Sequence, residues 1–252
     1  MKYFLYIFFV FFSVTSGLSQ NIYYKHNSFF GFQFRPLIPL SVVGDAPFDI
    51  QEENFITTIT TKMGYNYGGV IRVGISESMA IETGLSYTKR NYQTTFWVPD
   101  SNLVASSSLG IVNYDIPINM LVYVKLFDEL YMNASLGGSL NFYPSNVRTT
   151  VNPFGQHLFI FEGRRGGFFS FDVNANVGFE YRTEKSGNFY LGISGKIPVS
   201  PIFLIASEYR YDTQRTVAFG QVEGASFSLD LKYFFHNETY KRDGFKPGPI
   251  EQ

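Results

Sequence analysis

The sequence predicts an all-β protein, specifically an eight-stranded antiparallel up-and-down transmembrane β-barrel. Eight segments, each of about nine residues or more, alternate apolar side chains with small or polar ones. Short and long connections alternate between these segments, and aromatic residues make up 19% of the 252 residues against 16% charged. A strand in a soluble protein averages roughly 5–6 residues, whereas a tilted membrane-spanning strand needs roughly 9–11.

The chain opens with a segment typical of a secretory signal. Lys2 supplies a positive charge, and Tyr3–Phe12 is an unbroken apolar run. This run has the length of a signal-peptide core and is too short for a spanning helix of roughly 20 residues. Gly17 and Ser19 are small residues in the positions that favour cleavage. We therefore expect residues 1–19 to be a signal peptide, with an N-terminal membrane anchor as the alternative, and the mature protein to be exported.

The rest of the chain is divided into strands by its two-residue periodicity. In Met79–Tyr87, for example, Met79, Ile81, Leu85 and Tyr87 share one face. The eight predicted strands include Phe30–Phe34, Tyr65–Ile75, Met79–Tyr87, Ile116–Leu126, Leu130–Phe142, Phe169–Tyr181, Phe189–Ile197 and Phe227–Phe235.

The connections predict which rim of the barrel faces outward. Tight turns are expected near 76–78, 127–129 and 183–186, and long connections near 37–63, 93–111, 144–166 and 199–224. Outer-membrane barrels have short periplasmic turns and longer extracellular loops. We therefore expect a barrel over residues 20–235 with four long outer loops, followed by a polar periplasmic tail over 236–252.

The polar face of the strands indicates that the apolar face points outward, into lipid. A soluble barrel, the alternative, would carry many Lys and Glu residues on its outer face. Here the polar face is mostly small, with Gly137, Ser139 and Asn141 on one strand, which suits a crowded lumen. The apolar face carries almost no charge, as contact with hydrocarbon requires.

Strand register predicts ion pairs inside the barrel. If Ile75 pairs with Met79, then Arg72 lies opposite Glu82, where opposite charges attract. The same arithmetic places Asp115 opposite Asn141, Lys125 opposite Tyr131, and Lys196 opposite Asn174 and diagonal to Asp172, with Arg35, Asp230 and Lys232 near closure. The predicted lumen polar network consists of Arg72, Glu82, Asp115, Lys125, Asp172, Lys196 and Asp230.

This network fits a plug of hydrogen-bonded side chains, because eight strands leave a bore that side chains just fill. A wide pore is therefore not expected. The pair of Arg72 with Glu82 fits a structural staple better than a gated ion path, which is the alternative.

Several segments together resemble the Bacteroidetes outer-membrane β-barrel family that includes PorT-like proteins. They cover most of the mature chain, and their order carries the resemblance because each motif alone is weak. They are Tyr67–Val70, Ile81–Tyr87, Asn113–Ile118, Leu136–Gly138, Val177–Tyr181 and Phe227–Phe235. The first strand lacks the family's Gly-rich start, and a tail follows the final aromatic residue. The resemblance implies an eight-stranded barrel in the outer membrane, and some relatives serve protein secretion and gliding-type machinery.

Composition argues against several classes of function. The absence of cysteine excludes a disulfide scaffold and a thiolate metal site, and a net charge of -1 argues against nucleic-acid binding. Of the histidines, His157 lies in the third long connection, where a hydrolase or acyltransferase would need it near a carboxylate or Ser, but no spacing indicates that. We therefore expect no enzymatic activity, no cofactor and no metal site.

The long connections carry the remaining candidate sites. Arg164 and Arg165 could clamp an anionic lipid or lipopolysaccharide phosphate, with a solvated hinge as the other interpretation. Apolar loop residues such as Phe48, Phe55 and Phe159 could pack over the barrel mouth or form a partner surface. The sequence thus predicts a non-enzymatic outer-membrane barrel whose loops bind a partner or envelope component in a secretion or envelope complex. The alternatives are a narrow channel or small-solute transporter and a soluble exported β-protein.

Overall fold

The structure is a computed structural model, and it describes residues 28–39, 47–76, 78–153, 155–183 and 186–236. The predicted signal peptide over 1–19 and the tail from residue 237 onward lie outside the described residues. The described chain is built from antiparallel strands and one short 3-10 turn, η2 (Pro99–Ser101). No helix within these ranges is long and apolar enough to cross a membrane.

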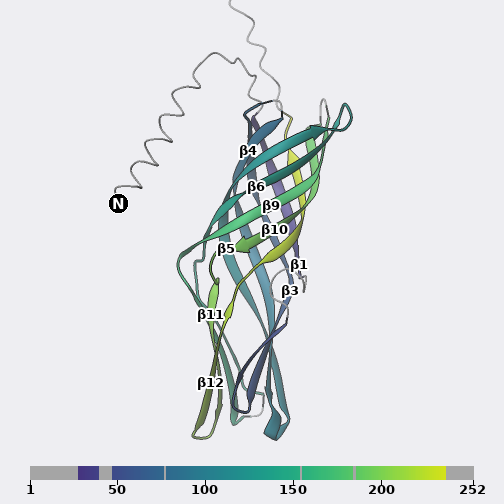
Figure 1. Cartoon of the computed structure of the whole chain (residues 1–252). Helices are drawn as coiled ribbons and strands as arrows, with labels where there is room; N and C mark the ends of the chain where they lie inside the picture. The colour runs from purple at the N-terminus through teal and green to yellow at the C-terminus, as the bar shows by residue number, and fades with distance from the viewer. Residues whose placement is uncertain (1–27, 40–46, 77, 154, 184–185, 237–252) are drawn as a thin grey trace, which may run out of the picture.

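Eight strands form a closed ring, which confirms the predicted fold class (Figure 1). Neighbours around the ring follow the order β1, β13, β10, β9, β6, β5, β4, β3, and pairing of β1 with β3 closes it. The eight strands are β1 (Ser28–Ile38), β3 (Phe55–Gly74), β4 (Met79–Val98), β5 (Leu103–Lys125), β6 (Leu130–Phe142), β9 (Phe169–Arg182), β10 (Asn188–Pro198) and β13 (Ser226–Phe234).

The register inferred from the sequence is confirmed wherever it was specified. Arg72 lies opposite Glu82 in the β3–β4 ladder. Asp115 lies opposite Asn141 between β5 and β6, and Lys196 lies opposite Asn174 between β9 and β10. The register is well determined because a slip by one residue would turn every apolar side chain inward.

Prolines interrupt two ladders without changing their register. Pairing of β4 with β5 is missing between Thr83 and Ser86, next to Pro117. Pairing of β1 with β13 is missing next to Pro36. Proline has no backbone N–H to donate, so these gaps have a direct chemical cause.

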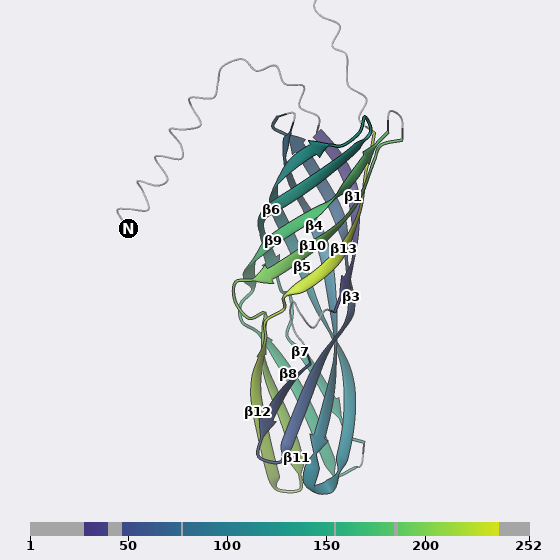
Figure 2. The ribbon, with the colours of Figure 1, turned by 45° about the vertical axis from the view of Figure 1, so that its right-hand side comes forward.

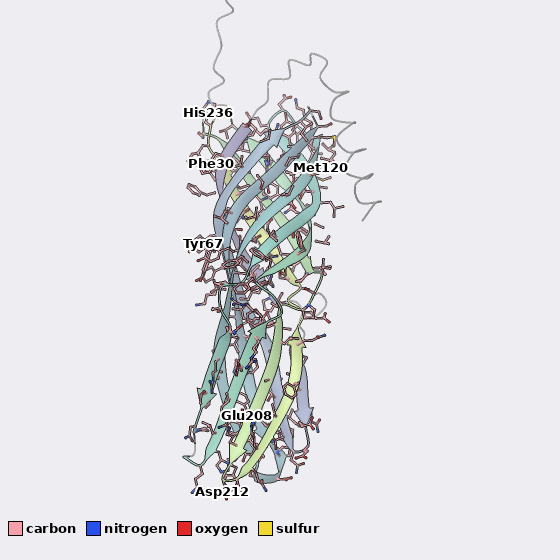
Figure 3. The ribbon with its side chains drawn as sticks, turned by 90° about the vertical axis from the view of Figure 1, so that its left-hand side faces the viewer. Phe30, Tyr67, Met120, Glu208, Asp212 and His236 are labelled. Atoms are coloured by element: carbon pink, nitrogen blue, oxygen red, sulfur yellow. The ribbon has the colours of Figure 1, made fainter. Side chains whose placement is uncertain are left out.

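The outer face of the barrel is apolar. Leu136, Phe171 and Ile118 expose 64%, 64% and 63% of their surface, and Phe30 and Met120 also point away from the barrel (Figure 3). From Tyr65 to Ile75, and at the matching heights of the other described barrel strands, Lys89 is the one outward Lys, Arg, Asp or Glu, and it lies opposite Tyr65 at the edge of this band. Such a surface matches hydrocarbon rather than water.

Aromatic side chains border this apolar face at both ends. At one end Tyr65, Tyr67, Tyr87 and Tyr114 contact one another, with ring centroids 5.2–6.3 Å apart. At the other end Phe30, Phe32, Tyr233 and Phe235 form a similar group. From Tyr65 to Ile75 a strand rises ~33 Å, or about 25 Å along the barrel axis after a tilt of ~40°. The apolar band thus has the height of a bilayer core.

Within the described residues, the four long connections consist mostly of strands, in contrast to the expectation from sequence. Strands β3, β4 and β5 continue past the ring and reach lengths of 20, 20 and 23 residues. Five further strands fill the other connections: β2 (Phe48–Glu52), β7 (Val147–Val151), β8 (His157–Arg165), β11 (Phe203–Tyr211) and β12 (Gln214–Val222). The two-residue alternation is present here too, but Thr and Ser at many outward positions weaken its apolar signal.

These extensions form a second layered unit, which we call the distal β-domain (Figure 2). It comprises β2, β7, β8, β11 and β12 with the parts of β3, β4 and β5 beyond the barrel. One sheet has the order β12, β11, β8, β7, and it faces the extension of the barrel sheet, β5, β4, β3, β2. Between the sheets lies an apolar core that includes Phe55, Ile59, Phe96, Phe159 and Phe203. The apolar connection residues therefore pack against one another.

A β-bulge separates the barrel from the distal β-domain. The β3–β4 register shifts between Lys62 and Tyr65, where β3 contains one extra residue. A bulge bends a strand and increases its twist, so the same two strands can serve both units. Gly64 lies at this point, and an added Cβ would come within 2.4 Å of the Lys89 carbonyl oxygen. The close approach of the two backbones therefore requires glycine.

We expect Phe159→Ala to unfold the distal β-domain while leaving the barrel intact. Phe159 is fully buried and contacts the rings of Phe55, Phe96 and Tyr209, so the cavity should cost about 3–5 kcal/mol. Limited proteolysis should then cut the distal β-domain, while the barrel keeps its heat-dependent gel mobility. The exposed Phe219→Ala should behave as wild type. Equal protease resistance in both variants would contradict an independent distal core.

Candidate functional site

The bore of the barrel contains a cluster of buried charges at the height of the short turns. Arg72 pairs with Glu82, at 2.6 Å between Nη2 and Oε2, and also with Glu180. Lys232 pairs with the other oxygen of Glu82, and Arg182 pairs with the other oxygen of Glu180, at 2.6 Å. The pair of Arg72 with Glu180 joins β3 to β9 and the pair of Lys232 with Glu82 joins β13 to β4, so these two ion pairs cross the bore.

A second group of ion pairs lies nearer to the distal β-domain. Lys196 Nζ lies 2.6 Å from Asp115 Oδ2, and Arg35 Nε lies 3.3 Å from Asp230 Oδ2. Neutral side chains complete the set, as Asn66 donates hydrogen bonds to Asp115. Further hydrogen bonds to Asp115 and Asp230 come from Ser86, Thr88, Asn176, Ser194 and Ser228.

The charged side chains of this arrangement are buried inside the bore. Asp115, Glu180 and Asp230 have no exposed surface, and Arg72 and Glu82 are almost fully buried. A buried charge that loses its partner costs several kcal/mol, so moving these side chains aside is unfavourable. The ion pairs thus form a plug of charged side chains inside the bore. The outward face of the same strands is apolar.

The structure places the predicted lumen residues as follows. Arg72, Glu82, Asp115, Lys196 and Asp230 point into the bore and take part in the ion pairs above. Asp172 is also buried there, but no ion pair to it is seen among the described residues.

Lys125 was predicted for the network and lies outside it. Its side chain is 54% exposed at the rim, where Nζ lies 3.0 Å from Asp128 in the adjoining turn. In the alternation of β5, Lys125 stands at an inward-facing position, as expected. It is the last residue of that strand, however, and its long side chain reaches water.

Sequence reasoning missed Glu180 and Arg182 as members of the network. Their positions on β9 alternate with the outward-facing Phe179 and Tyr181, so strand parity alone could have identified them. Glu180 pairs with Arg72 on β3 and with Arg182 on its own strand. Register relates only neighbouring strands, so it could not predict the pair that joins β9 to β3 across the bore.

A cleft of about 730 Å³ opens at the far end of the distal β-domain. It lies between the turns at Glu53 and Asp100 on one side and the strands β8, β11 and β12 on the other. Figure 3 marks this end of the molecule by Asp212 in the β11–β12 turn. The mouths of β-barrels and similar layered β-structures are common sites for ligands of this size.

Aromatic rings form one wall of this distal cleft. The His157 ring stacks on Tyr211 at 4.4 Å and lies parallel to Tyr209 at 6.0 Å. His157 Nδ1 and the Tyr209 hydroxyl share a hydrogen bond of 2.8 Å. Tyr209 in turn contacts Phe55 and Phe159, so the wall is continuous with the distal core.

Charged groups also surround the distal cleft. Glu208 accepts hydrogen bonds from Arg210 and from Arg215, the latter at 2.5 Å. The Arg210 guanidinium, followed by that of Arg215, holds the pKa of the Glu208 carboxyl below its usual range. Glu53 and Asp100 line the other side, and Asp100 accepts a hydrogen bond from Asn54.

The two arginines predicted to contact lipopolysaccharide are placed differently. Arg164 is exposed and pairs with Glu162 at 2.8 Å. Arg165 donates hydrogen bonds to the carbonyl oxygens of Tyr143 and Pro144, and its guanidinium lies 3.6 Å from the Phe168 ring centroid. Arg165 therefore holds the connection between barrel and distal β-domain, while Arg164 faces outward.

No group of three or more His, Cys, Asp or Glu side chains that could hold a metal ion occurs among the described residues. Of the histidines, His236 lies at the opposite end of the molecule from the distal cleft (Figure 3). His26 lies outside the described residues.

Comparison with solved structures gives several similarities, among them the following two. The chain is similar to the outer membrane protein OprG from Pseudomonas aeruginosa, with 13% identity and a TM-score of 0.49 over 83% of this chain and 96% of OprG. It is also similar to the beta domain of the Bordetella autotransporter BrkA, with 11% identity and a TM-score of 0.30 over 84% and 99% of the two chains. No protein-family model and no curated protein match the chain. The barrel assignment rests on the closed strand ring.

We expect Arg72→Leu to destabilise the barrel by about 3–5 kcal/mol, because it leaves Glu82 and Glu180 in the bore with fewer cations. The measurement is the temperature at which the detergent-solubilised barrel loses its compact gel mobility. Arg164→Leu is the matched control, since its exposed ion pair should contribute about 0–1 kcal/mol. Equal effects of the two substitutions would show that the ion pairs of the bore stabilise the barrel no more than an exposed ion pair does.

We expect the β11–β12 hairpin to loosen in acid. The folded pKa of Glu208 is depressed, so its stabilising effect is complete above the unfolded value near 4.5 and disappears as pH falls through the folded value. Hydrogen exchange of this hairpin, corrected for intrinsic rates, should show protection falling below pH 4.5. Glu208→Gln should remove the pH dependence attributable to this residue. An unchanged acid profile in Glu208→Gln would contradict this assignment.

Proposed function

We propose that this chain is a non-enzymatic outer-membrane β-barrel that displays the distal β-domain outside the cell. The observation that carries the proposal is the contrast between the two faces of the barrel strands. Their outward positions are apolar over a band of about 25 Å, with the one charge, Lys89, at its edge. Their inward positions hold buried, paired charges such as Arg72 and Glu82. This is the reverse of a soluble protein, in which charged groups favour the surface.

The extent of the exposed apolar surface supports a membrane location over the soluble alternative. A soluble monomer rarely exposes an apolar patch of more than a few hundred Å². Here the apolar exterior surrounds the barrel, with Phe30, Leu85, Ile118, Leu136 and Phe171 on different strands. Lipid would cover this surface, whereas water would not.

The two rims support an orientation with the distal β-domain outside. The short turns join β3 to β4, β5 to β6 and β9 to β10 at one rim, where the described chain also begins and ends (Figure 1). The distal β-domain extends from the opposite rim. Outer-membrane barrels place short turns in the periplasm, and the signal-like segment at residues 1–19 provides for export.

The bore favours display over transport. A channel or small-solute transporter would need the ion pairs of Arg72, Glu82 and Glu180 to open, and each is fully paired and buried. Rigid strands instead hold the distal cleft about 43 Å or less from the membrane, at ~3.3 Å per residue along extensions of about 10–13 residues. We propose that this domain recognises a partner molecule or envelope component, as rigid scaffolds with variable ends commonly do.

Two finer points belong to the same proposal. The resemblance to PorT-like barrels supports a place in a secretion or envelope complex. Arg164 is exposed on β8, next to Arg165, whose guanidinium lies on the Phe168 ring, and its own guanidinium could bind a lipopolysaccharide phosphate. His157 is hydrogen-bonded to Tyr209 rather than to a Ser or a carboxylate, which supports a role without catalysis.

Paired arginine substitutions on the outward face test the membrane location. Leu136→Arg places a charge in the middle of the apolar band and should cost about 2–4 kcal/mol. We expect it to reduce the amount of folded, heat-modifiable barrel in outer-membrane fractions. Val104→Arg is the control, because Val104 is similarly exposed but lies on the distal β-domain. Wild-type protein in aqueous extracts, or tolerance of both substitutions, would overturn the proposed location.

A further inference from the structure

The inward-facing side chains of the distal β-domain change in character toward its open end. On β8 and β11 the deep positions are mostly apolar, as at Phe161 and Ile205, with the buried Ser207 as an exception. The last two inward-facing cross-strand pairs are Phe159 with Tyr209 and His157 with Tyr211. The domain therefore ends in a polar, aromatic opening rather than in a capped apolar core.

The rings at this opening form a flat platform. The planes of Tyr209 and Tyr211 each lie within 10° of the His157 plane. Tyr211 is the last ring of the series and remains 38% exposed. His157 covers one of its faces, and Tyr211 lines the distal cleft.

This platform is held in place by the fold. Tyr209 packs against the buried Phe55 and Phe159, and its hydroxyl is hydrogen-bonded to His157. A ligand that stacks on Tyr211 would therefore meet an aromatic wall that is already ordered. Pre-organisation of this kind reduces the entropy lost on binding.

Hydrogen-bonding groups lie around the platform. Glu53, Asp100, Asn54 and Gln214 line the distal cleft and offer carboxylate and amide groups. Arg215 also lines it and pairs with Glu208, which Arg210 shares. The cleft is thus rich in acceptors, and its lining carries two carboxylates, Glu53 and Asp100, against the one guanidinium of Arg215, which disfavours phosphate and other anions.

We propose that the distal cleft binds a short, uncharged saccharide. A sugar ring has an apolar face of C–H groups that stacks on a flat aromatic ring, and hydroxyl groups at its edge that donate to carboxylates and amides. A cleft of about 730 Å³ suits a ligand of a few sugar units. This inference rests on the proposed display function, since it assigns a ligand to the domain that the barrel presents.

The geometry argues against the other ligands that aromatic residues recognise. A quaternary ammonium group is bound by rings that surround it as a cage, whereas these rings are nearly parallel. An extended peptide would add to an exposed strand edge, whereas this cleft opens at strand ends and turns.

The test uses the full-length chain, purified in detergent, on an array of neutral, amino-containing, sialylated and phosphorylated glycans. The strongest neutral ligand is then titrated against variants of the protein. We expect wild-type protein to bind neutral glycans. Tyr211→Ala should weaken binding at least tenfold, whereas Tyr211→Phe, which keeps the ring, should remain within about threefold of wild type.

Asp100→Asn provides a second variant at an exposed position and should weaken binding at least threefold. Phe219→Ala is the matched control, because Phe219 is an exposed aromatic residue on β12 outside the cleft. Heat-dependent gel mobility and far-ultraviolet circular dichroism report whether each variant is folded.

Three results would overturn the inference: no glycan bound by the wild type, binding confined to anionic glycans, or full binding by both folded Tyr211→Ala and Asp100→Asn. The assay does not require a membrane, so its failure differs from failure of the proposed function. A chain that assembles in the outer membrane but binds no neutral glycan loses the saccharide site and keeps the display role.

Discussion

The structure depends on one constraint, which is that the outer face of the barrel strands is apolar across the membrane-facing band, with Lys89 only at its edge. The other charged side chains on these strands within the band therefore point into a bore too narrow for water to solvate them well. A buried charge is costly without a partner, and most of the charges in the bore are paired. The chain of contacts from Lys232 through Glu82, Arg72 and Glu180 to Arg182 meets this requirement with side chains from both halves of the sequence.

The same three strands link the barrel to the distal β-domain. Because β3, β4 and β5 pass from one unit into the other, the distal β-domain is held by continuous backbone rather than by flexible connections. The bulge near Gly64 provides the bend, and Arg165 fastens the β8 side through the carbonyls of Tyr143 and Pro144. A binding cleft at the far end of such a stalk would be held at a fixed distance from the membrane.

The barrel and the distal β-domain place their apolar side chains on opposite faces of their strands. In the barrel, apolar residues such as Leu136 face outward and polar residues face inward. In the distal β-domain, Phe55, Phe96 and Phe159 face inward, as in a water-soluble protein. On β4 both patterns occur in one strand, with Ile81 exposed and Phe96 buried. The point at which the pattern inverts marks the boundary between lipid and water.

The sequence by itself determined the closed barrel, its register and the outward direction of its apolar face. These follow from the two-residue period and from the scarcity of charge, which act locally along each strand. Only the tertiary structure decided that the long connections are strands and that Glu180 and Arg182 join the ion pairs across the bore. It also brought Glu53, Asp100, His157 and Tyr211 to one cleft. These contacts join residues far apart in the chain, and no local periodicity records which distant strands will face one another.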